Sequence, residues 1–231
     1  MENTVENAYN LSIRISSDGF SLFVNDKYGL QISSKTLTVP MFSLPAEELV
    51  KLLSIETQLN YQNIRIVCES DIYLFVPEPV FKPEEASVFL NFQHNLQKSD
   101  SVIYNTIPTW NTVNVFAIPS TLHQAIAELF PKLKIEHQMS YLLTDKIKFQ
   151  QENSLHVWSR PRMQDIVILK EGRLQLMNSY SYQTSEDFCY HTLNVIEQLS
   201  VDTEKCNVYL YNTEQKPELA KLLNNYVTVI S

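Results

Sequence analysis

Residues 20–32 have the sequence Phe20-Ser-Leu-Phe-Val-Asn-Asp-Lys-Tyr-Gly-Leu-Gln-Ile32, and a similar pattern recurs at Ile166-Val-Ile-Leu-Lys-Glu-Gly-Arg-Leu-Gln-Leu176. Each stretch has an apolar run, a glycine-containing turn and a second apolar run, which is typical of two strands joined by a hairpin. A further strand-like run precedes each copy, and an amphipathic helical pattern and another strand follow it. We therefore predict an internal duplication of a three-stranded meander followed by a helix and a strand.

The spacing of apolar and turn residues predicts where the elements of each copy lie. In the first copy, strands are expected at residues 10–15, 20–24, 30–39 and 63–68, with a helix that begins near Pro45. In the second copy, strands are expected at residues 155–159, 165–169, 173–180 and 208–211. The helix of this copy should begin after Thr184-Ser-Glu-Asp187, which resembles a capping box.

The two copies suggest two domains, 1–151 and 152–231, separated at a polar stretch near residues 150–153. The strand, helix and strand patterns at Ile72–Val76, Pro83–Phe92 and Val102–Ile107 have no counterpart in the second copy. We therefore predict that the first domain carries an insertion at about residues 71–109.

The composition excludes several classes of protein. The formal net charge is −8 and the chain has no basic run, so a nucleic-acid-binding surface is not expected. Three cysteines, Cys68, Cys189 and Cys206, lack the spacing of a zinc or redox site, and we predict buried thiols in a reducing compartment. The N-terminus has no signal-peptide pattern, and no apolar run could cross a bilayer. These features predict a cytoplasmic protein without membrane insertion.

The order of three strands, helix, strand, helix and strand, present twice, resembles the actin-like ATPase superfamily. Asn63 to Leu143 is similar to pilus and secretion assembly proteins of that superfamily, chiefly through Val113-Asn-Val-Phe-Ala-Ile-Pro119 and Leu133-Lys-Ile-Glu-His137. The whole chain is similar to a family of uncharacterised Bacteroidetes proteins with this fold. The resemblance implies an α/β fold of duplicated ribonuclease-H-like domains, each a mixed sheet flanked by helices.

The resemblance also implies a site for ATP and magnesium between the halves, formed by two hairpin turns and a glycine-rich adenosine loop. The first turn is Ser16-Ser17-Asp18-Gly19, which is either a vestigial phosphate loop or a hairpin turn that uses Asp-Gly for its backbone geometry. We favour the hairpin turn. The loop expected between about Cys206 and Glu218 contains no glycine.

The second turn runs from Ser159 to Asp165 and also lacks glycine, and Pro161 has no N–H to donate. Arg160 and Arg162 in this turn either face a phosphate or are simply solvated. With two of three nucleotide elements missing, no cofactor is expected. ATP with magnesium belongs only to the alternative in which the chain is an ATPase.

Catalytic and metal-binding residues are not predicted. A two-metal nuclease site needs an acidic residue in the first strand, and residues 11–15 and 155–158 contain none. The histidines lack the spacing of a metal site and are expected at the surface or at the edge of the core; they are His94, His123, His137, His156 and His191.

The sequence therefore favours a degenerate, non-catalytic actin-like protein that binds another protein, as an assembly scaffold. The alternatives are a nucleotide-binding ATPase or a small-ligand sensor that uses the interdomain cleft. The expected partner surface is the insertion, with Tyr73, Phe75 and Trp110 as contact residues. Its strand Ile72–Val76 either offers an edge to a partner, which leaves self-association open, or pairs internally with Val102–Ile107.

Overall fold

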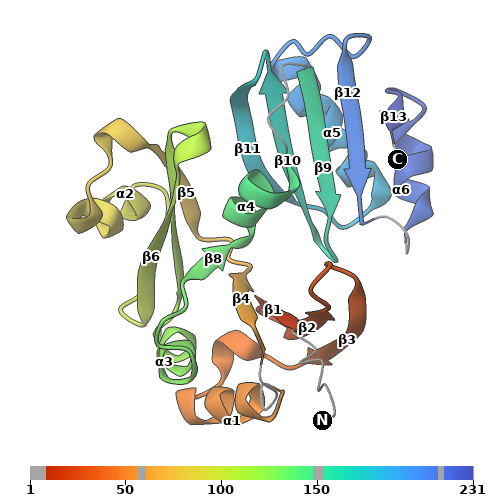
Figure 1. Cartoon of the computed structure of the whole chain (residues 1–231). Coiled ribbons are helices and arrows are strands. Elements are labelled where there is room, and N and C mark those ends of the chain that lie inside the picture. Colours follow the sequence, from red (N-terminus) through yellow and green to blue (C-terminus); the bar gives the residue numbers. More distant parts are fainter. Residues whose placement is uncertain (1–8, 57–60, 148–152, 213–215, 231) are drawn as a thin grey trace. The chain divides into compact units, whose positions relative to one another are not determined.

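The computed structural model describes residues 9–56, 61–147, 153–212 and 216–230 (Figure 1). The chain forms two compact units, Met1–Lys146 and Ile147–Ser231. The boundary expected between residues 151 and 152 lies outside the described residues. Each unit contains a five-stranded sheet.

The main sheet of the first unit has the strand order β3-β2-β1-β4-β8. Strands β1, β2 and β3 pair antiparallel, whereas β4 runs parallel to both β1 and β8. Alternate residues of β1 are buried, so one face of this sheet packs into the core. The strands are β1 (Asn10–Ser16), β2 (Gly19–Asn25), β3 (Gln31–Thr38), β4 (Asn63–Cys68) and β8 (Ile135–His137).

The main sheet of the second unit repeats this topology, with the order β11-β10-β9-β12-β13 and the same pattern of antiparallel and parallel pairs. Gly29 and Gly172 lie in the turns between the second and third strands of their units, with φ of 87° and 72°. Residues with a Cβ atom rarely adopt this left-handed backbone conformation, so glycine is favoured at both turns. The matching strand orders and turns confirm the predicted duplication. The strands are β9 (Asn153–Ser159), β10 (Met163–Lys170), β11 (Arg173–Ser181), β12 (Cys206–Tyr211) and β13 (Val229–Ile230).

The helices also occupy matching places in the chain. In the first unit, η1 (Met41–Ser43) and α1 (Ala46–Glu56) follow β3, and α3 (Ser120–Leu129) precedes β8. In the second unit, α5 (Ser185–Gln198) follows β11 and α6 (Pro217–Leu223) precedes β13. The α/β class predicted from sequence is confirmed. No helix in the described ranges is long and apolar enough to cross a membrane.

Helix α5 begins with the capping box expected from the sequence. The backbone N–H of Asp187 donates to Thr184 Oγ1 at 3.1 Å, and the backbone N–H of Thr184 donates to Asp187 Oδ2 at 3.0 Å. These bonds satisfy donors that a helix start otherwise leaves without partners. They also fix where the buried face of α5, which includes Phe188, Thr192 and Ile196, meets the sheet.

The insertion in the first unit is a second, smaller sheet. Its strands β5 (Tyr73–Pro77), β6 (Asp100–Ile107) and β7 (Thr112–Pro119) have the order β5-β7-β6. The inserted sheet therefore extends to Pro119, not to about residue 109. Strand β7 is buried on both faces, so its apolar sequence is also typical of a strand in a main sheet. The shorter elements are η2 (Glu78–Val80), η3 (Pro83–Glu85), α2 (Ala86–Asn91) and η4 (Pro108–Trp110).

His137 joins the main sheet of the first unit to the inserted sheet. Its side chain is 1% exposed. Nδ1 accepts hydrogen bonds from Asn114 Nδ2 of β7 at 2.9 Å and from the backbone N–H of Met139 at 3.2 Å. Nε2 donates to the carbonyl of Ser70 at 2.9 Å, so these partners fit a neutral ring protonated on Nε2. The expectation that His137 lies at the surface or core edge was wrong, because a buried imidazole is stable when both nitrogens are bonded.

The three residues expected to contact a partner do not form one exposed surface. Tyr73 is buried, with its ring centroid 4.7 Å from that of His137. Phe75 and Trp110 are half-buried, and Trp110 Nε1 donates to the carbonyl of Leu143 at 3.2 Å. Strand β5 pairs with β7 and not with β6, so the internal pairing differs from the one proposed.

In the second unit, four rings stack on one face of β9 and β12. The ring centroids of Trp158 and Tyr211 are 4.7 Å apart, and those of His156 and Tyr209 are 4.9 Å apart. The other face of these strands contributes to the apolar core that includes Phe188 of α5. Burial of His156 lowers its pKa to about 4.

We predict that protonation of His156 destabilises the protein as the pH falls from about 6.5 to about 4. In this pH range the unfolded chain binds a proton at His156 and the folded chain does not. The free energy of unfolding should therefore fall by about 3 kcal/mol. Urea denaturation at a series of pH values should show a steeper loss for the unmodified protein than for His156→Gln. Equal pH dependence of the two proteins would contradict the prediction.

A second prediction concerns the buried imidazole of the first unit. His137→Leu should lower the free energy of unfolding by about 2–4 kcal/mol, because buried groups of Asn114 and Ser70 lose their partner. His123→Leu is the control, since His123 is half-buried and makes no hydrogen bond within the described residues. Chemical denaturation should separate the two variants, and equal midpoints would argue against the bridging role of His137.

Candidate functional site

The turn between β1 and β2 contains the first group of predicted site residues. Ser16 Oγ lies 2.7 Å from Asp18 Oδ1 and 3.1 Å from the carbonyl of Gly19. The carbonyl of Asp18 accepts from the backbone N–H of Val39 at 3.1 Å. Ser17 and Asp18 are exposed, and neither has positive φ. The hydroxyl and carboxylate thus serve the turn itself.

Gly19 is required by packing. A Cβ atom at this position would lie 2.2 Å from the carbonyl oxygen of Leu37 on β3, a distance at which something must shift. The φ of Gly19 is not positive, so the turn geometry expected of Asp-Gly is not the reason for the glycine. The close approach of two strand backbones is the reason, and it needs no phosphate.

The turn between β9 and β10 holds the second group. Arg160 is largely buried, and its Nη2 lies 2.8 Å from Oδ1 of the fully buried Asp165. Asp165 Oδ1 also accepts from Ser179 Oγ at 2.7 Å. The alternatives of a phosphate-facing or solvated Arg160 are therefore replaced by a buried ion pair. Arg162 is exposed.

The same turn presents carbonyl oxygens to a cation. Lys216 Nζ donates to the carbonyls of Pro161 at 3.1 Å and Arg160 at 3.3 Å, and to the hydroxyl of Tyr182 at 2.7 Å. The hydroxyl of Ser159 lies 2.9 Å from that of Tyr182. A phosphate site needs converging N–H groups, whereas here carbonyls converge on an ammonium group.

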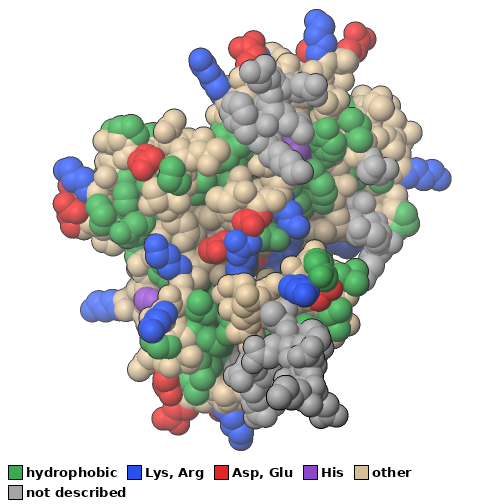
Figure 2. All heavy atoms as spheres, in the orientation of Figure 1, with side chains coloured by type: hydrophobic (Ala, Val, Ile, Leu, Met, Phe, Trp, Pro, Cys, Tyr) green, Lys and Arg blue, Asp and Glu red, His purple; other side chains and the backbone are tan. Residues whose placement is uncertain are grey.

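Other ligand classes have little support within the described ranges. No group of three or more His, Cys, Asp or Glu side chains there could hold a metal ion. Part of the segment expected to hold adenosine, residues 213–215, lies outside the described residues. On the face in Figure 2, the coloured acidic and basic side chains are interspersed, without a broad basic area.

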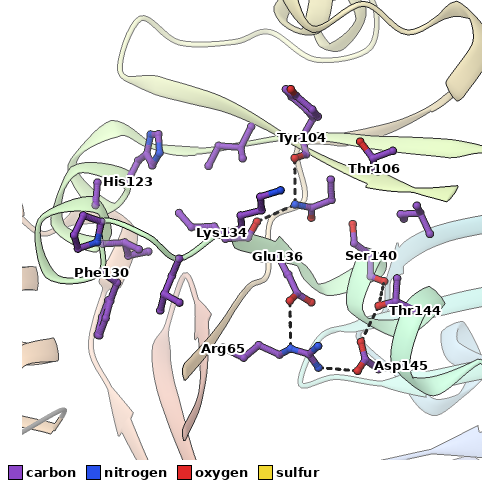
Figure 3. A pocket seen from close by; sticks show the side chains of 18 residues that line it. Arg65, Tyr104, Thr106, His123, Phe130, Lys134, Glu136, Ser140, Thr144 and Asp145 are labelled. Carbon is purple, nitrogen blue, oxygen red and sulfur yellow. Dashed lines mark hydrogen bonds and ion pairs between the residues drawn. The ribbon is translucent and has the colours of Figure 1, made fainter. Parts of the chain in front are cut away.

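A pocket of about 670 Å³ opens within the first unit (Figure 3). One wall is the edge strand β6, from Ile103 to Ile107. The opposite side is formed by α3 and by the segment that leads into β8. Two short helices that follow β8, α4 (Gln138–Tyr141) and η5 (Leu142–Lys146), complete it. The remaining lining residues are Arg65, His123, Ile126, Ala127, Phe130, Pro131, Leu133, Lys134, Ile135, Glu136, Ser140, Thr144 and Asp145.

Asn105 holds the two strands beside the pocket together. Its Nδ2 donates to the carbonyl of Ile135 at 2.9 Å, and its Oδ1 accepts from the backbone N–H of His137 at 2.7 Å. Strands β6 and β8 are each the last strand of their sheet. The amide side chain thus replaces strand pairing at one point, and β6 has no further strand neighbour in the described chain.

One end of the pocket carries a charged network. Arg65 Nε lies 3.2 Å from Glu136 Oε1, and Arg65 Nη1 lies 2.7 Å from Asp145 Oδ1. Thr144 Oγ1 donates to Asp145 Oδ2 at 2.8 Å. Burial raises the pKa of Glu136, although the Arg65 charge opposes this shift. Both acidic groups of the pocket therefore already have a basic partner.

The lining away from this network includes apolar side chains, a lysine and a histidine. Ala127, Phe130 and Leu133 are among the apolar lining residues. Within the described residues, His123 and Lys134 make no hydrogen bond or ion pair, and Figure 3 shows Lys134 directed into the pocket. Lys134 thus offers the pocket a positive charge that no acidic side chain of the described residues neutralises.

Comparison with known proteins places this chain in a family. Residues 1–230 match the family described as "Protein of unknown function (DUF3822)". The chain belongs to the DUF3822 family. A comparison with curated proteins gave no match.

The DUF3822 protein is similar to two solved structures that share its fold. A Bacteroides thetaiotaomicron protein with an actin-like ATPase fold and unknown function has 25% identity and a TM-score of 0.80, over 98% of this chain and 91% of that one. The structure of the PilM–PilN type IV pilus biogenesis complex has 12% identity and a TM-score of 0.50, over 95% of this chain and 86% of that one. The actin-like fold expected from the sequence is confirmed.

The pocket of the DUF3822 protein was not predicted from the sequence. Arg65 and Glu136 of its charged network lie in Asn63–Cys68, predicted only as a strand, and in Leu133–His137, noted only for the family resemblance. In each, a charge alternates with isoleucine, as at Arg65 and Glu136. This alternation places the charges on one face of neighbouring strands and was an available signal.

We predict that Gly19→Ala lowers the free energy of unfolding of the DUF3822 protein by about 1–3 kcal/mol, because the added methyl group meets the Leu37 carbonyl. Ser17→Ala, in the same turn, should change stability by less than about 0.5 kcal/mol, since Ser17 is exposed. Urea denaturation gives both values. Unchanged stability of Gly19→Ala would point back to a ligand-binding reason for the glycine.

Proposed function

We propose that this DUF3822 protein is a non-catalytic member of the actin-like fold that binds a segment of another protein in the pocket of its first unit. The observation that carries the proposal is the pocket itself, where an edge strand, apolar side chains and Lys134, which has no acidic partner among the described residues, meet in one cavity of about 670 Å³. Edge strands and mixed polar and apolar cavities are common places for peptide recognition.

The geometry of the two predicted nucleotide turns supports a non-catalytic role. At the first turn, Gly19 is explained by the packing of β3. At the second, Arg160 is neutralised by Asp165, and Lys216 occupies the carbonyls of the turn. These arrangements leave little for a triphosphate to bind.

The fold comparison agrees with a protein partner. The PilM structure, which has the same fold, is described as a complex with PilN in type IV pilus biogenesis. At 12% identity this likeness identifies no partner for the DUF3822 protein. It supports only the general idea that the fold can serve assembly.

We predict that ATP with magnesium gives no binding heat at micromolar concentrations. Isothermal titration calorimetry on the full chain measures this directly. A saturable signal that Asp18→Ala abolishes would instead support the nucleotide-binding alternative.

Partner binding at the pocket can be tested by site-specific photo-cross-linking. A cross-linking amino acid at Thr106, which is exposed and lines the pocket, should trap a discrete protein in the native host. The control position is Lys51, which is exposed on α1 and outside the pocket. Adducts that are the same at both positions, or none from Thr106, would contradict the proposed function.

A further inference from the structure

We infer that the pocket of the first unit selects an extended, acidic and apolar protein segment, with an aspartate or glutamate side chain beside Lys134. This inference rests on the proposed function and names the chemistry of the partner. It follows from the free edge of β6, from the distribution of charge along the pocket and from the apolar side chains of its lining.

The free edge of β6 favours an extended segment. Five consecutive residues of this strand, Ile103 to Ile107, line the pocket, and β7 is the one strand that pairs with β6 in the described part of the chain. An edge strand presents N–H and carbonyl groups that an added strand can bond. Asn105 spans the gap to β8 at one point, so the β6 wall is held in place without a strand neighbour along the rest of the edge.

The distribution of charge favours an acidic segment. The two acidic groups of the lining, Glu136 and Asp145, both pair with Arg65. Lys134 has no such partner within the described ranges, and its side chain is directed into the pocket (Figure 3). A carboxylate bound there gains a charge-assisted contact, whereas a basic side chain meets like charge.

The neighbouring side chains favour an apolar residue next to that carboxylate. Phe130 and Leu133 line the same pocket as Lys134. Along an extended peptide, alternate side chains point to opposite sides, so an acidic and an apolar residue in succession can meet different walls. The preferred segment therefore alternates apolar and acidic residues.

The test is selection of random peptides, displayed as internal fusions without a free C-terminus, on the full-length protein. A peptide depends on the pocket if it no longer binds the Ala127→Trp variant but still binds the Gln124→Trp variant. Both residues are exposed on α3, and only Ala127 lines the pocket. We expect these binders to be enriched in Asp and Glu and depleted in Lys and Arg relative to the library.

Affinity measurements then test the role of Lys134. Fluorescence anisotropy of the best peptide should show about tenfold weaker binding to Lys134→Glu. Lys132→Glu, an exposed residue outside the lining, should bind as the unmodified protein does. Equal losses in both variants would overturn the specific contact at Lys134.

The outcomes separate this inference from the proposed function. Pocket-dependent peptides without acidic enrichment, or with basic enrichment, would overturn the acidic segment and leave protein binding at the pocket intact. If no pocket-dependent peptide emerges and Thr106 traps no protein, the acidic segment and the proposed function are both overturned.

Methylation of the peptide's backbone N–H groups, one at a time, tests the extended form. In an added strand, methylation should weaken binding at every second residue, and an equal loss at every residue would argue against the extended form.

Discussion

The architecture of the first unit depends on the buried imidazole of His137. This ring lies at the end of β8, where it bonds Asn114 of the inserted sheet and the Ser70 carbonyl that follows β4. Leaving these groups unbonded in the core would cost more than the bonds themselves contribute. The imidazole therefore helps to hold the inserted sheet against the main sheet, and Asn105 sets the separation of β6 and β8 beside the pocket.

The duplication gives the two units one topology and different uses of it. In the second unit, β12 leads toward α6 and β13 without an inserted sheet. In the first, three strands and α2 stand between β4 and α3. The pocket lies where the inserted sheet meets the main sheet of the first unit, because both of its strand walls are sheet edges. The insertion thus adds a cavity while the main sheet keeps the strand order of its counterpart in the second unit.

The β9–β10 turn of this chain differs in geometry from a phosphate-binding turn. Binding an anion requires backbone N–H groups that converge on it. In the β9–β10 turn, the carbonyls of Arg160 and Pro161 converge instead on Lys216, and the arginine side chain is used by Asp165. This turn therefore binds a cationic group, whereas a nucleotide loop binds an anion.

The sequence alone determined the repeated topology, the glycine turns at Gly29 and Gly172, and the capping box at Thr184, because strand alternation, positive φ and helix capping are local properties. Only the tertiary structure decided that Tyr73 and His137 are buried, that Arg160 is paired, and that the insertion includes β7. Those outcomes depend on which distant segments pack together. Residues 65, 105, 134 and 136 form one pocket for the same reason: two sheet edges, β6 and β8, meet across the side chain of Asn105.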